Sequence, residues 1–331
     1  MKIYTVAQDG SGDFNSLQQA VDRAAEQEGA AEIRILAGKY HEKVIVHKSH
    51  LRIIGEGPEK TVLTWSGCAK DLYPDGTEKG TFMSSTLMVT GNDVEIENLT
   101  VRNDAGDGRK VGQAVAVYAA GDRGSWRNCR LIAHQDTLFC GPLRIPNVTE
   151  EVGTRKGEAE AVSRVEDGHP TSGRQYFEDC YIEGDVDFIF GCYRCWFERC
   201  TLFMGERGGW YTAANTNEKQ PWGFVFHACR LTGACEHGKA FLGRPWRAFA
   251  RTVFLACEMD EHVAPEGFAD WDEQRVVTDR CGEWRTTGAA AEQRTRHPSQ
   301  KRLTDEEAAD YTPERVLNGW NPAARAKGKT V

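Results

Sequence analysis

Apolar residues follow two different periods along the chain. Near the start, Leu17, Ala20, Val21 and Ala24 recur at helical spacing behind Asn15 or Ser16, either of which caps a helix well. This pattern predicts a helix that ends before Gly29. From Ile33 onward the apolar runs are short and separated by turn residues, which predicts strands such as 33–36, 44–46 and 51–54.

A longer repeat then appears. An apolar residue is followed, three and five positions later, by a cysteine or leucine and by an aliphatic residue. The repeat begins at Ile96, Trp126, Phe177, Phe197, Phe226 and Phe254. The odd spacing between the first two positions indicates a corner between two strands, after which the cysteine and the aliphatic residue face one interior. Such a unit buries its apolar face only by stacking on its neighbours, so the pattern predicts one parallel β-solenoid domain over residues 1–331.

Two segments fall outside this repeat. The interval between Cys129 and Cys180 is about twice the usual 20 to 30 residues, and its proline-rich excess predicts a surface insertion at 141–173 that borders the site described below. We expect residues 282–331 to form a C-terminal tail packed outside the solenoid. Within it, Thr304 and Glu307 form a capping box for a helix that Pro313 breaks or kinks.

The net charge and the number of cysteines limit the possible partners and cellular compartment of the protein. The formal net charge of -8 argues against nucleic acid as a partner. No apolar run approaches the length of a membrane span, and no export signal is evident at Met1. The eleven cysteines are an odd number and are read as free thiols, most of them small apolar core residues. We therefore expect a cytoplasmic protein, with secretion as the alternative.

The pair Cys192 and Cys195 has the spacing of a redox or zinc motif. It lacks a βαβ context and a second matching pair, so core packing is the favoured interpretation. No metal ligand set and no cofactor is predicted.

Four polar positions interrupt the apolar strands. Asp187 lies between Val186 and the run 188–190, where an unpaired carboxylate costs several kcal/mol to bury. Gln113, the pair Gln135 and Asp136, and Arg244 are similar polar islands. Taken singly, each has a structural explanation: a salt bridge for Asp187, a turn cap for Gln135 and Asp136, a satisfied strand amide for Gln113, and a cation–π pair for Arg244.

Taken together, these motifs resemble a known family. The segments Gln113-Ala-Val-Ala-Val, Gln135-Asp-Thr-Leu, Gly184-Asp-Val-Asp-Phe-Ile-Phe-Gly and Leu242-Gly-Arg-Pro-Trp occur in the order found in pectin methylesterases, or pectinesterases. The likeness runs from about residue 4 to about residue 322. It departs at Phe268, where a tryptophan is common, and in the long insertion at 141–173.

The resemblance implies a right-handed parallel β-helix and a set of roles. Asp187 would be the nucleophile and Asp136 the general acid and then base. Gln113 and Gln135 would form the oxyanion hole, and Arg244 would hold Asp187 ionised. The residues implied to contact the sugar chain are Trp246, Phe139, Phe190, Thr81 and Val186.

These residue types suit ester hydrolysis. Two neutral amides stabilise a tetrahedral oxyanion, and two carboxylates in unequal environments supply one ionised and one protonated group. We expect Arg244 to lower the pKa of Asp187, and the neighbouring negative charge to raise that of Asp136.

The implied substrate is the C6 methyl ester of galacturonate in methylated homogalacturonan or oligogalacturonides, handled by a monomer that needs no cofactor. Because the protein is expected in the cytoplasm, we favour short imported oligomers. The alternatives are an esterase or thioesterase for a non-pectin ester and a non-catalytic oligosaccharide-binding solenoid. A decayed site would have lost one of the five polar residues, and all five are present.

Overall fold

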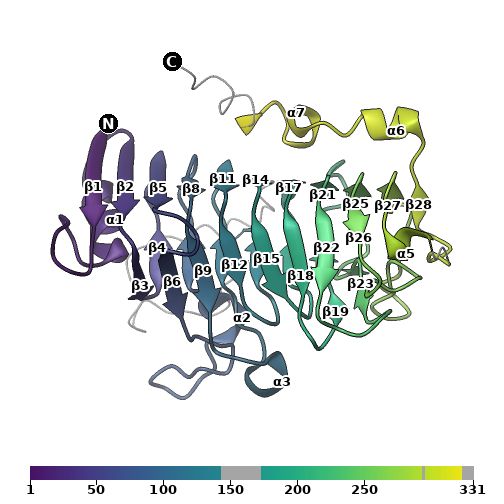
Figure 1. Cartoon of the computed structure of the whole chain (residues 1–331), viewed down its shortest axis with the longest axis horizontal. Coiled ribbons are helices and arrows are strands. Elements are labelled where there is room, and N and C mark those ends of the chain that lie inside the picture. The colour runs from purple at the N-terminus through teal and green to yellow at the C-terminus, as the bar shows by residue number, and fades with distance from the viewer. Residues whose placement is uncertain (143–172, 293–294, 323–331) are drawn as a thin grey trace.

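The computed structural model describes residues 1–142, 173–292 and 295–322, and it is a parallel β-helix (Figure 1). Successive turns of the chain contribute strands to three long parallel sheets. Sheet A has the order β1 (Lys2–Val6), β2 (Ala31–Ile35), β5 (Leu51–Gly55), β8 (Glu95–Glu97), β11 (Gly124–Arg127), β14 (Arg174–Glu178), β17 (Arg194–Glu198), β21 (Phe224–His227), β25 (Thr252–Leu255), β27 (Cys281–Trp284) and β28 (Lys301–Arg302).

The other two long sheets complete each turn. Sheet B has the order β3 (Gly38–His41), β6 (Thr61–Trp65), β9 (Thr100–Asn103), β12 (Arg130–Ile132), β15 (Tyr181–Gly184), β18 (Thr201–Met204), β22 (Arg230–Gly233) and β26 (Glu258–Met259). Sheet C has the order β4 (Val44–Val46), β7 (Leu87–Val89), β10 (Val117–Ala119), β13 (Leu138–Cys140), β16 (Ile189–Gly191), β20 (Thr212–Ala214) and β24 (Arg244–Pro245). A short fourth sheet pairs β19 (Gly209–Trp210) with β23 (Ala240–Phe241). The predicted all-β solenoid is therefore confirmed.

The predicted corner lies between sheets A and B, and one residue makes it. In each repeat a residue with left-handed backbone stands two positions after the apolar residue that opens the unit. Its φ is 59° at Asn98, 48° at Asn128, 53° at Asp179, 49° at Arg199, 52° at Ala228 and 51° at Ala256. This single residue turns the chain and explains the odd spacing seen in the sequence.

The interior is built from columns of like residues. Phe177, Phe197, Phe226 and Phe254 stack with ring centroids 4.7, 4.4 and 4.6 Å apart, and Trp126 extends the column. Each buried phenylalanine contributes about 1.5–3 kcal/mol through its lost contact with water. The cysteines at the repeat position, among them Cys129, are buried free thiols beside this column, as predicted. Cys192 and Cys195 are buried as well, and the described residues contain no cluster that could hold a metal ion.

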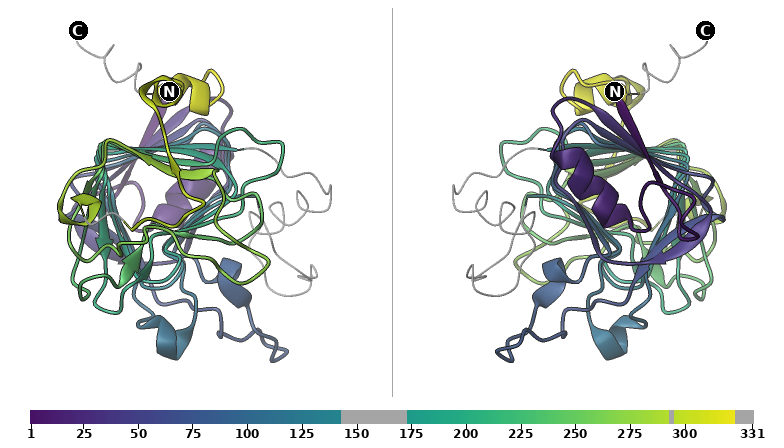
Figure 2. Two further views of the ribbon diagram at one scale, coloured as in Figure 1. Left: turned by 90° about the vertical axis from the view of Figure 1, so that its right-hand side faces the viewer. Right: turned by 90° about the vertical axis from the view of Figure 1, so that its left-hand side faces the viewer.

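The N-terminal end of the solenoid is covered by α1 (Leu17–Ala25), visible end-on in Figure 2. The Ser16 side chain accepts a hydrogen bond from the Gln19 N–H, and Leu17, Ala20, Val21 and Ala24 are buried, as their spacing predicts. Two further helices, α2 (Gly80–Met83) and α3 (Gly108–Val111), are single turns in loops. None of the helices in the described ranges is long and apolar enough to cross a membrane.

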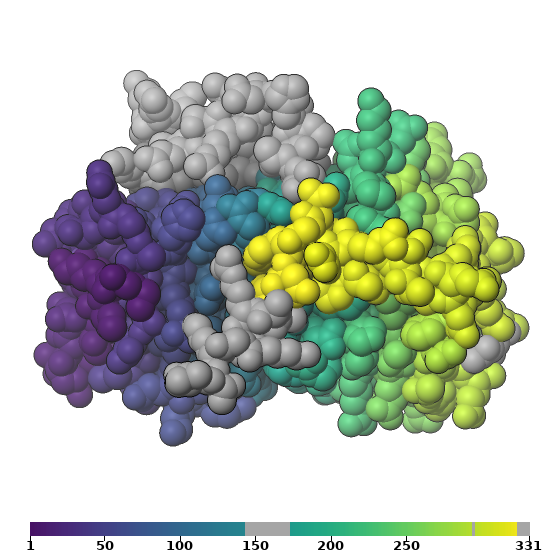
Figure 3. All heavy atoms as spheres, turned by 90° about the horizontal axis from the view of Figure 1, so that it is seen from above, coloured from purple at the N-terminus to yellow at the C-terminus, as the bar shows by residue number. Residues whose placement is uncertain are grey.

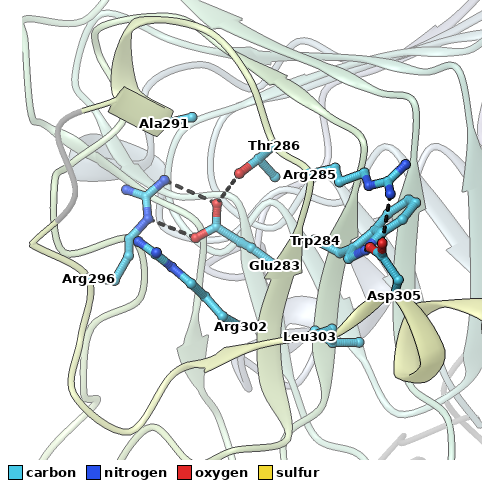
Figure 4. Close-up of a pocket in the computed structure, with 9 residues that line it drawn as sticks. All are labelled: Glu283, Trp284, Arg285, Thr286, Ala291, Arg296, Arg302, Leu303 and Asp305. Atoms are coloured by element: carbon cyan, nitrogen blue, oxygen red, sulfur yellow. Dashed lines mark hydrogen bonds and ion pairs between the residues drawn. The ribbon is translucent and has the colours of Figure 1, made fainter.

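The expected tail boundary at residue 282 is wrong, because the sheet continues past it. Strand β27 pairs with β25 and β28 pairs with β27, which extends the main-chain hydrogen bonding of sheet A. Glu283 of β27 holds the loop between β27 and β28 through its two carboxylate oxygens. Arg296 Nε lies 2.8 Å from one oxygen, and Thr286 Oγ1 donates to the other at 2.9 Å (Figure 4). The short helix α5 (Ala289–Glu292) lies in this loop.

The true tail begins after β28 and returns along sheet A. Its predicted helix is split into α6 (Asp305–Ala309) and α7 (Pro313–Val316), with the capping box at Thr304 and Glu307 formed and Pro313 starting the second helix. Val316 and Leu317 pack on outward-facing Tyr176, Trp196, Val225, Val253 and Leu255 of sheet A, as the yellow segment in Figure 3 illustrates. The predicted insertion at 141–173 lies almost wholly outside the described residues.

The left-handed corners yield a prediction about stability. Ala228 is exposed and adopts φ of 52°, a conformation that costs an L-residue roughly 1–2 kcal/mol and glycine almost nothing. We expect Ala228→Gly to raise the free energy of unfolding by about 1 kcal/mol, measured by denaturant titration. The control Ala119→Gly, in buried strand β10, should lower it. A destabilised Ala228→Gly variant would contradict this account of the corner.

Candidate active site

Five successive turns of the solenoid, from β10 to β24, bring the predicted site residues together beside sheet C. Gln113 precedes β10, Gln135 and Asp136 precede β13, and Asp187 precedes β16, so the three segments lie on adjacent turns. Main-chain bonds fix their register: the Ala114 N–H donates to the Gln135 carbonyl at 3.1 Å, and the Asp136 N–H to the Val186 carbonyl at 3.0 Å. Because adjacent strands lie about 4.8 Å apart, the polar residues come within reach of one another.

The two carboxylates occupy sharp bends. Asp136 and Asp187 both have left-handed backbone, with φ of 68° and 53°, a conformation that aspartate adopts more readily than most residues. Gly184 allows the two turns to approach, since a Cβ there would lie 2.7 Å from the His134 carbonyl oxygen and 2.6 Å from Thr137 Oγ1. The glycine that opens the motif is therefore required by close packing between turns.

Arg244 reaches Asp187 from two strands away. It begins β24, which pairs with β20, and β20 pairs with β16. The guanidinium donates twice to one carboxylate, Nε to Oδ1 at 2.8 Å and Nη2 to Oδ2 at 2.7 Å. This bidentate, largely buried pair fixes the orientation of the Asp187 carboxylate.

Two tryptophans hold the guanidinium itself. The Arg244 Cζ lies 3.7 Å from the ring centroid of Trp210 and 3.8 Å from that of Trp271. Cation–π contacts of this kind contribute about 0.5–2 kcal/mol each. The sequence pattern did not indicate either tryptophan, because Trp210 of β19 and Trp271 of a loop lie far from Arg244 along the chain.

Burial dominates the protonation of both carboxylates. It raises the pKa of Asp136 well above the usual value, and the nearby Asp187 charge raises it further. It also raises the pKa of Asp187, although the two hydrogen bonds and the charge of Arg244 oppose that rise. Arg244 lowers the pKa of Asp187, as expected, but desolvation is the larger effect and the net pKa of Asp187 is raised. The unequal environments are present: Asp136 holds its proton to higher pH than Asp187.

The two glutamines present free amides. Their backbone carbonyls accept from neighbouring turns, Gln113 from the Ala69 N–H and Gln135 from the Ala114 N–H. Their side chains are half-buried and make no hydrogen bond in the part of the chain that the structure describes. Gly108 of α3 lies against Gln135, since a Cβ built there would come within 2.8 Å of the Gln135 Cβ. Both amides therefore remain available to a ligand.

The residues predicted to contact a sugar chain form part of an aromatic strip on the outside of sheet C. Phe139 lies 4.8 Å from Phe190 between ring centroids, and Phe190 lies 6.0 Å from Trp246. Trp246 is partly exposed, whereas Phe139 is fully covered and so supports the strip in the free protein. Val186 is buried beside Asp187, and Thr81 is half-buried in α2.

The strip also contains residues that sequence reasoning missed. Phe82, next to Thr81, packs on Phe139 with a centroid distance of 5.0 Å, and Tyr118 of β10 packs on Phe139 at 4.8 Å. His134 lies 3.5 Å from the buried carboxylate of Asp185, and this contact raises the pKa of His134. His134 precedes Gln135, and Asp185 lies two residues before Asp187. This nearness in sequence to the proposed catalytic positions was the one signal that could have indicated them.

Comparisons with known proteins agree with this geometry. The family model described as Pectinesterase matches residues 3–145 and 168–320. Pectinesterase 31 of Arabidopsis thaliana is 31% identical over 94% of this chain and 90% of its own length. Among solved structures, a pectin methylesterase from Erwinia chrysanthemi has a TM-score of 0.78 at 26% identity, covering 97% of both chains. Pectin methylesterase from carrot also has a TM-score of 0.78, at 28% identity, covering 97% of this chain and 95% of its own.

A parallel β-helix with two buried carboxylates, a paired arginine and two free amides, matched over nearly its whole length by such relatives, defines a carboxylic ester hydrolase. The chain belongs to the pectinesterase family.

The burial of Asp136 predicts how stability depends on pH. Because its pKa is raised in the folded state above the ordinary value of 3.8, the folded protein binds the proton more tightly than the unfolded chain. This contribution to stability is complete below pH 3.8 and is lost as pH rises through the folded pKa, by up to about 1.4 kcal/mol per pH unit. We expect Asp136→Asn to gain stability relative to the native chain between pH 4 and pH 7, measured by denaturant titration.

The exposed Asp279 supplies the control for this measurement. Asp279→Asn removes one carboxylate from the surface and is measured over the same pH range for comparison. If Asp136→Asn behaved like Asp279→Asn, Asp136 would not be the strongly perturbed acid that its burial implies.

Proposed function

We propose that this protein hydrolyses the C6 methyl ester of galacturonate units in pectin or pectin-derived oligogalacturonides and releases methanol. The observation that carries the proposal is the Asp187 carboxylate, oriented by Arg244 and placed on the turn adjacent to Asp136. A related solved structure is a pectin methylesterase in complex with a hexasaccharide, with a TM-score of 0.76 and 27% identity over 96% of this chain and 97% of its own.

In the first half of the proposed reaction, an Asp187 oxygen attacks the ester carbonyl carbon. The carbonyl oxygen becomes an oxyanion, and the free amides of Gln113 and Gln135 stabilise it, each by about 3–4 kcal/mol. The carbon–oxygen bond to the methoxy group then breaks. Asp136, which holds its proton because it is buried, transfers it to the leaving oxygen, and methanol departs.

The second half restores the enzyme. The product of the first half is a mixed anhydride between Asp187 and the substrate acyl group. Asp136, now a carboxylate, takes a proton from water as the water oxygen bonds to the acyl carbon. Collapse of this second oxyanion breaks the bond to Asp187, which leaves as a carboxylate, and the galacturonic acid is released. Arg244 stabilises the charge that Asp187 regains.

Compartment and assembly are part of the proposal. We place the protein in a reducing compartment, the cytoplasm, acting on short oligomers. Neighbouring buried cysteines such as Cys129 and Cys180 lie on adjacent turns, a spacing that permits disulfides, yet they are free thiols. A monomer is favoured because α1 covers the first turn and the loop at Glu283 crosses the last.

The direct test is methanol release from methylated oligogalacturonides of defined length and from polymeric pectin. We expect Asp187→Ala to lower kcat at least about a thousandfold, because the nucleophile is lost. Gln135→Ala should cost about 10²–10³-fold in kcat with little change in KM, because its amide acts on the oxyanion. Asp279→Asn, an exposed carboxylate, should leave both unchanged.

Three outcomes would revise the proposal in different ways. Full methanol release by Asp187→Ala would remove that residue from the role of nucleophile. A preference for the polymer would keep the mechanism but contradict the cytoplasmic assignment. No release from any pectic substrate by the native chain would favour a non-pectin ester or a binding role.

The tryptophan contacts predict a change in pH dependence. If Trp210 holds Arg244 in place, Trp210→Leu should weaken the Arg244–Asp187 pair and raise the pKa of Asp187 further. Because Asp187 must be ionised to attack, the acidic limb of kcat/KM should move to higher pH by roughly 0.5–1 unit. Trp210→Phe, which keeps an aromatic face, should restore most of the profile.

The control is Trp222→Leu, since Trp222 packs on Tyr311 at sheet A, away from Arg244. An acidic limb that moves equally in Trp222→Leu and Trp210→Leu would indicate general loosening of the fold instead of a local effect on Asp187.

A further inference from the structure

A second cavity lies on a different side of the solenoid from the proposed active site. It occupies about 650 Å³ on the outer face of sheet A, over β2, β5, β8 and β11, and ends at Trp320 and Pro322 of the tail. The tail packs on the apolar residues of this sheet from β14 onward, and Trp320 and Pro322 of the tail line one end of the cavity. We call it the sheet A groove. Its volume is in the range of small-molecule sites.

The charged side chains on the floor of the groove are largely paired with one another. Three arginines, Arg52, Arg123 and Arg127, face three carboxylates, Asp93, Glu95 and Glu97, and Met1 and His50 also line the groove. Each arginine is already engaged: Arg52 with Glu97 at 2.9 Å, Arg123 with Asp93 at 2.6 Å and Arg127 with Glu178 at 3.1 Å. A charged ligand would have to break one of these pairs, so the groove favours an uncharged one.

The same floor leaves hydrogen-bonding capacity unused. Ser125 of β11 is 2% exposed, and its Oγ has no hydrogen-bond partner, which is unfavourable for a buried hydroxyl. Its register partner Glu95 accepts no hydrogen bond among the described residues, and its nearest cation is Arg52 Nε at 3.9 Å. A hydroxyl and a carboxylate side by side are suited to a ligand rich in hydroxyl groups.

An aromatic wall completes the groove. Trp320 is partly exposed, and its backbone N–H donates to the Leu317 carbonyl at 3.1 Å, which fixes it beside the packed α7 segment. An aromatic ring offers an apolar face to the carbon-bound hydrogens of a sugar ring. Apolar contact on one side and hydroxyl partners on the other, with the arginines already paired, suit a carbohydrate.

We propose that the sheet A groove is a second, non-catalytic site that binds an uncharged oligosaccharide, and that its ligand is a methyl-esterified galacturonan segment. Naming that polymer rests on the proposed function. Methyl esterification removes the charge of each galacturonate, so an esterified segment fits the floor of paired charges and a de-esterified one does not. The groove would hold one esterified oligomer on the enzyme while the active site works on another.

The test uses the full-length Asp187→Ala chain labelled with 5-fluorotryptophan and titrated with methyl-esterified hexagalacturonate. The ¹⁹F signals of Trp320 and Trp246, assigned through Trp320→Phe and Trp246→Phe, report the groove and the active-site cleft separately. We expect both signals to titrate. Ser125→Ala removes only a hydroxyl without a protein partner, so folding should be unaffected, and it should weaken the Trp320 curve about three- to tenfold with the Trp246 curve unchanged.

Other results would overturn the inference. These are a Trp320 signal that does not titrate, a Trp320 curve insensitive to Ser125→Ala, or equal binding of the de-esterified hexamer at the groove. Methanol release by the native chain is measured alongside. Methanol release without a Trp320 response would contradict only the proposed binding site in the groove. A Trp320 response without methanol release would contradict the proposed function and support carbohydrate binding in the groove.

Discussion

The structure depends on stacking identical turns in register. Each turn places a like residue on the one before it, so aromatic rings meet aromatic rings in the column from Trp126 to Phe254, at centroid distances of 4.4 to 5.8 Å. The left-handed residue at each corner keeps that register, because a shift of one residue would turn every inward side chain outward. The site depends on the same constraint. Asp136 and Asp187 come together because their turns are bonded neighbours, with the Asp136 N–H donating to the Val186 carbonyl.

The buried carboxylates of the active site lower the stability of the solenoid. Two carboxylates are buried next to each other, which raises the pKa of both, and only Arg244 opposes the effect at Asp187. This loss of stability serves the chemistry, because the difference between the two environments leaves Asp187 ionised and Asp136 protonated over the same pH range. Trp210 and Trp271 hold the guanidinium of Arg244 in the position from which it donates two hydrogen bonds to one carboxylate.

The outer face of sheet A carries two different surfaces on one set of strands. From β14 onward it carries a row of apolar residues that the tail covers, while toward the N-terminus paired charges surround the groove. A parallel β-helix exposes every sheet to the outside, so each face is available for binding once the interior columns are satisfied. The proposed active site beside sheet C and the groove on sheet A are two uses of that property.

The sequence by itself determined the solenoid, its corner position and the five polar residues of the site, because the repeat and the motifs are local patterns that each turn restates. It also indicated the capping helix and the split at Pro313, which follow from side-chain hydrogen bonds and proline geometry over a few residues. The tertiary structure decided the rest. Trp210 of β19 and Trp271 of a later loop meet Arg244 only because the turns stack, and β27 and β28 join sheet A because an open edge was available to them. The net pKa of Asp187 and the full covering of Phe139 depend on burial, a sum over many neighbours that no spacing along the chain records.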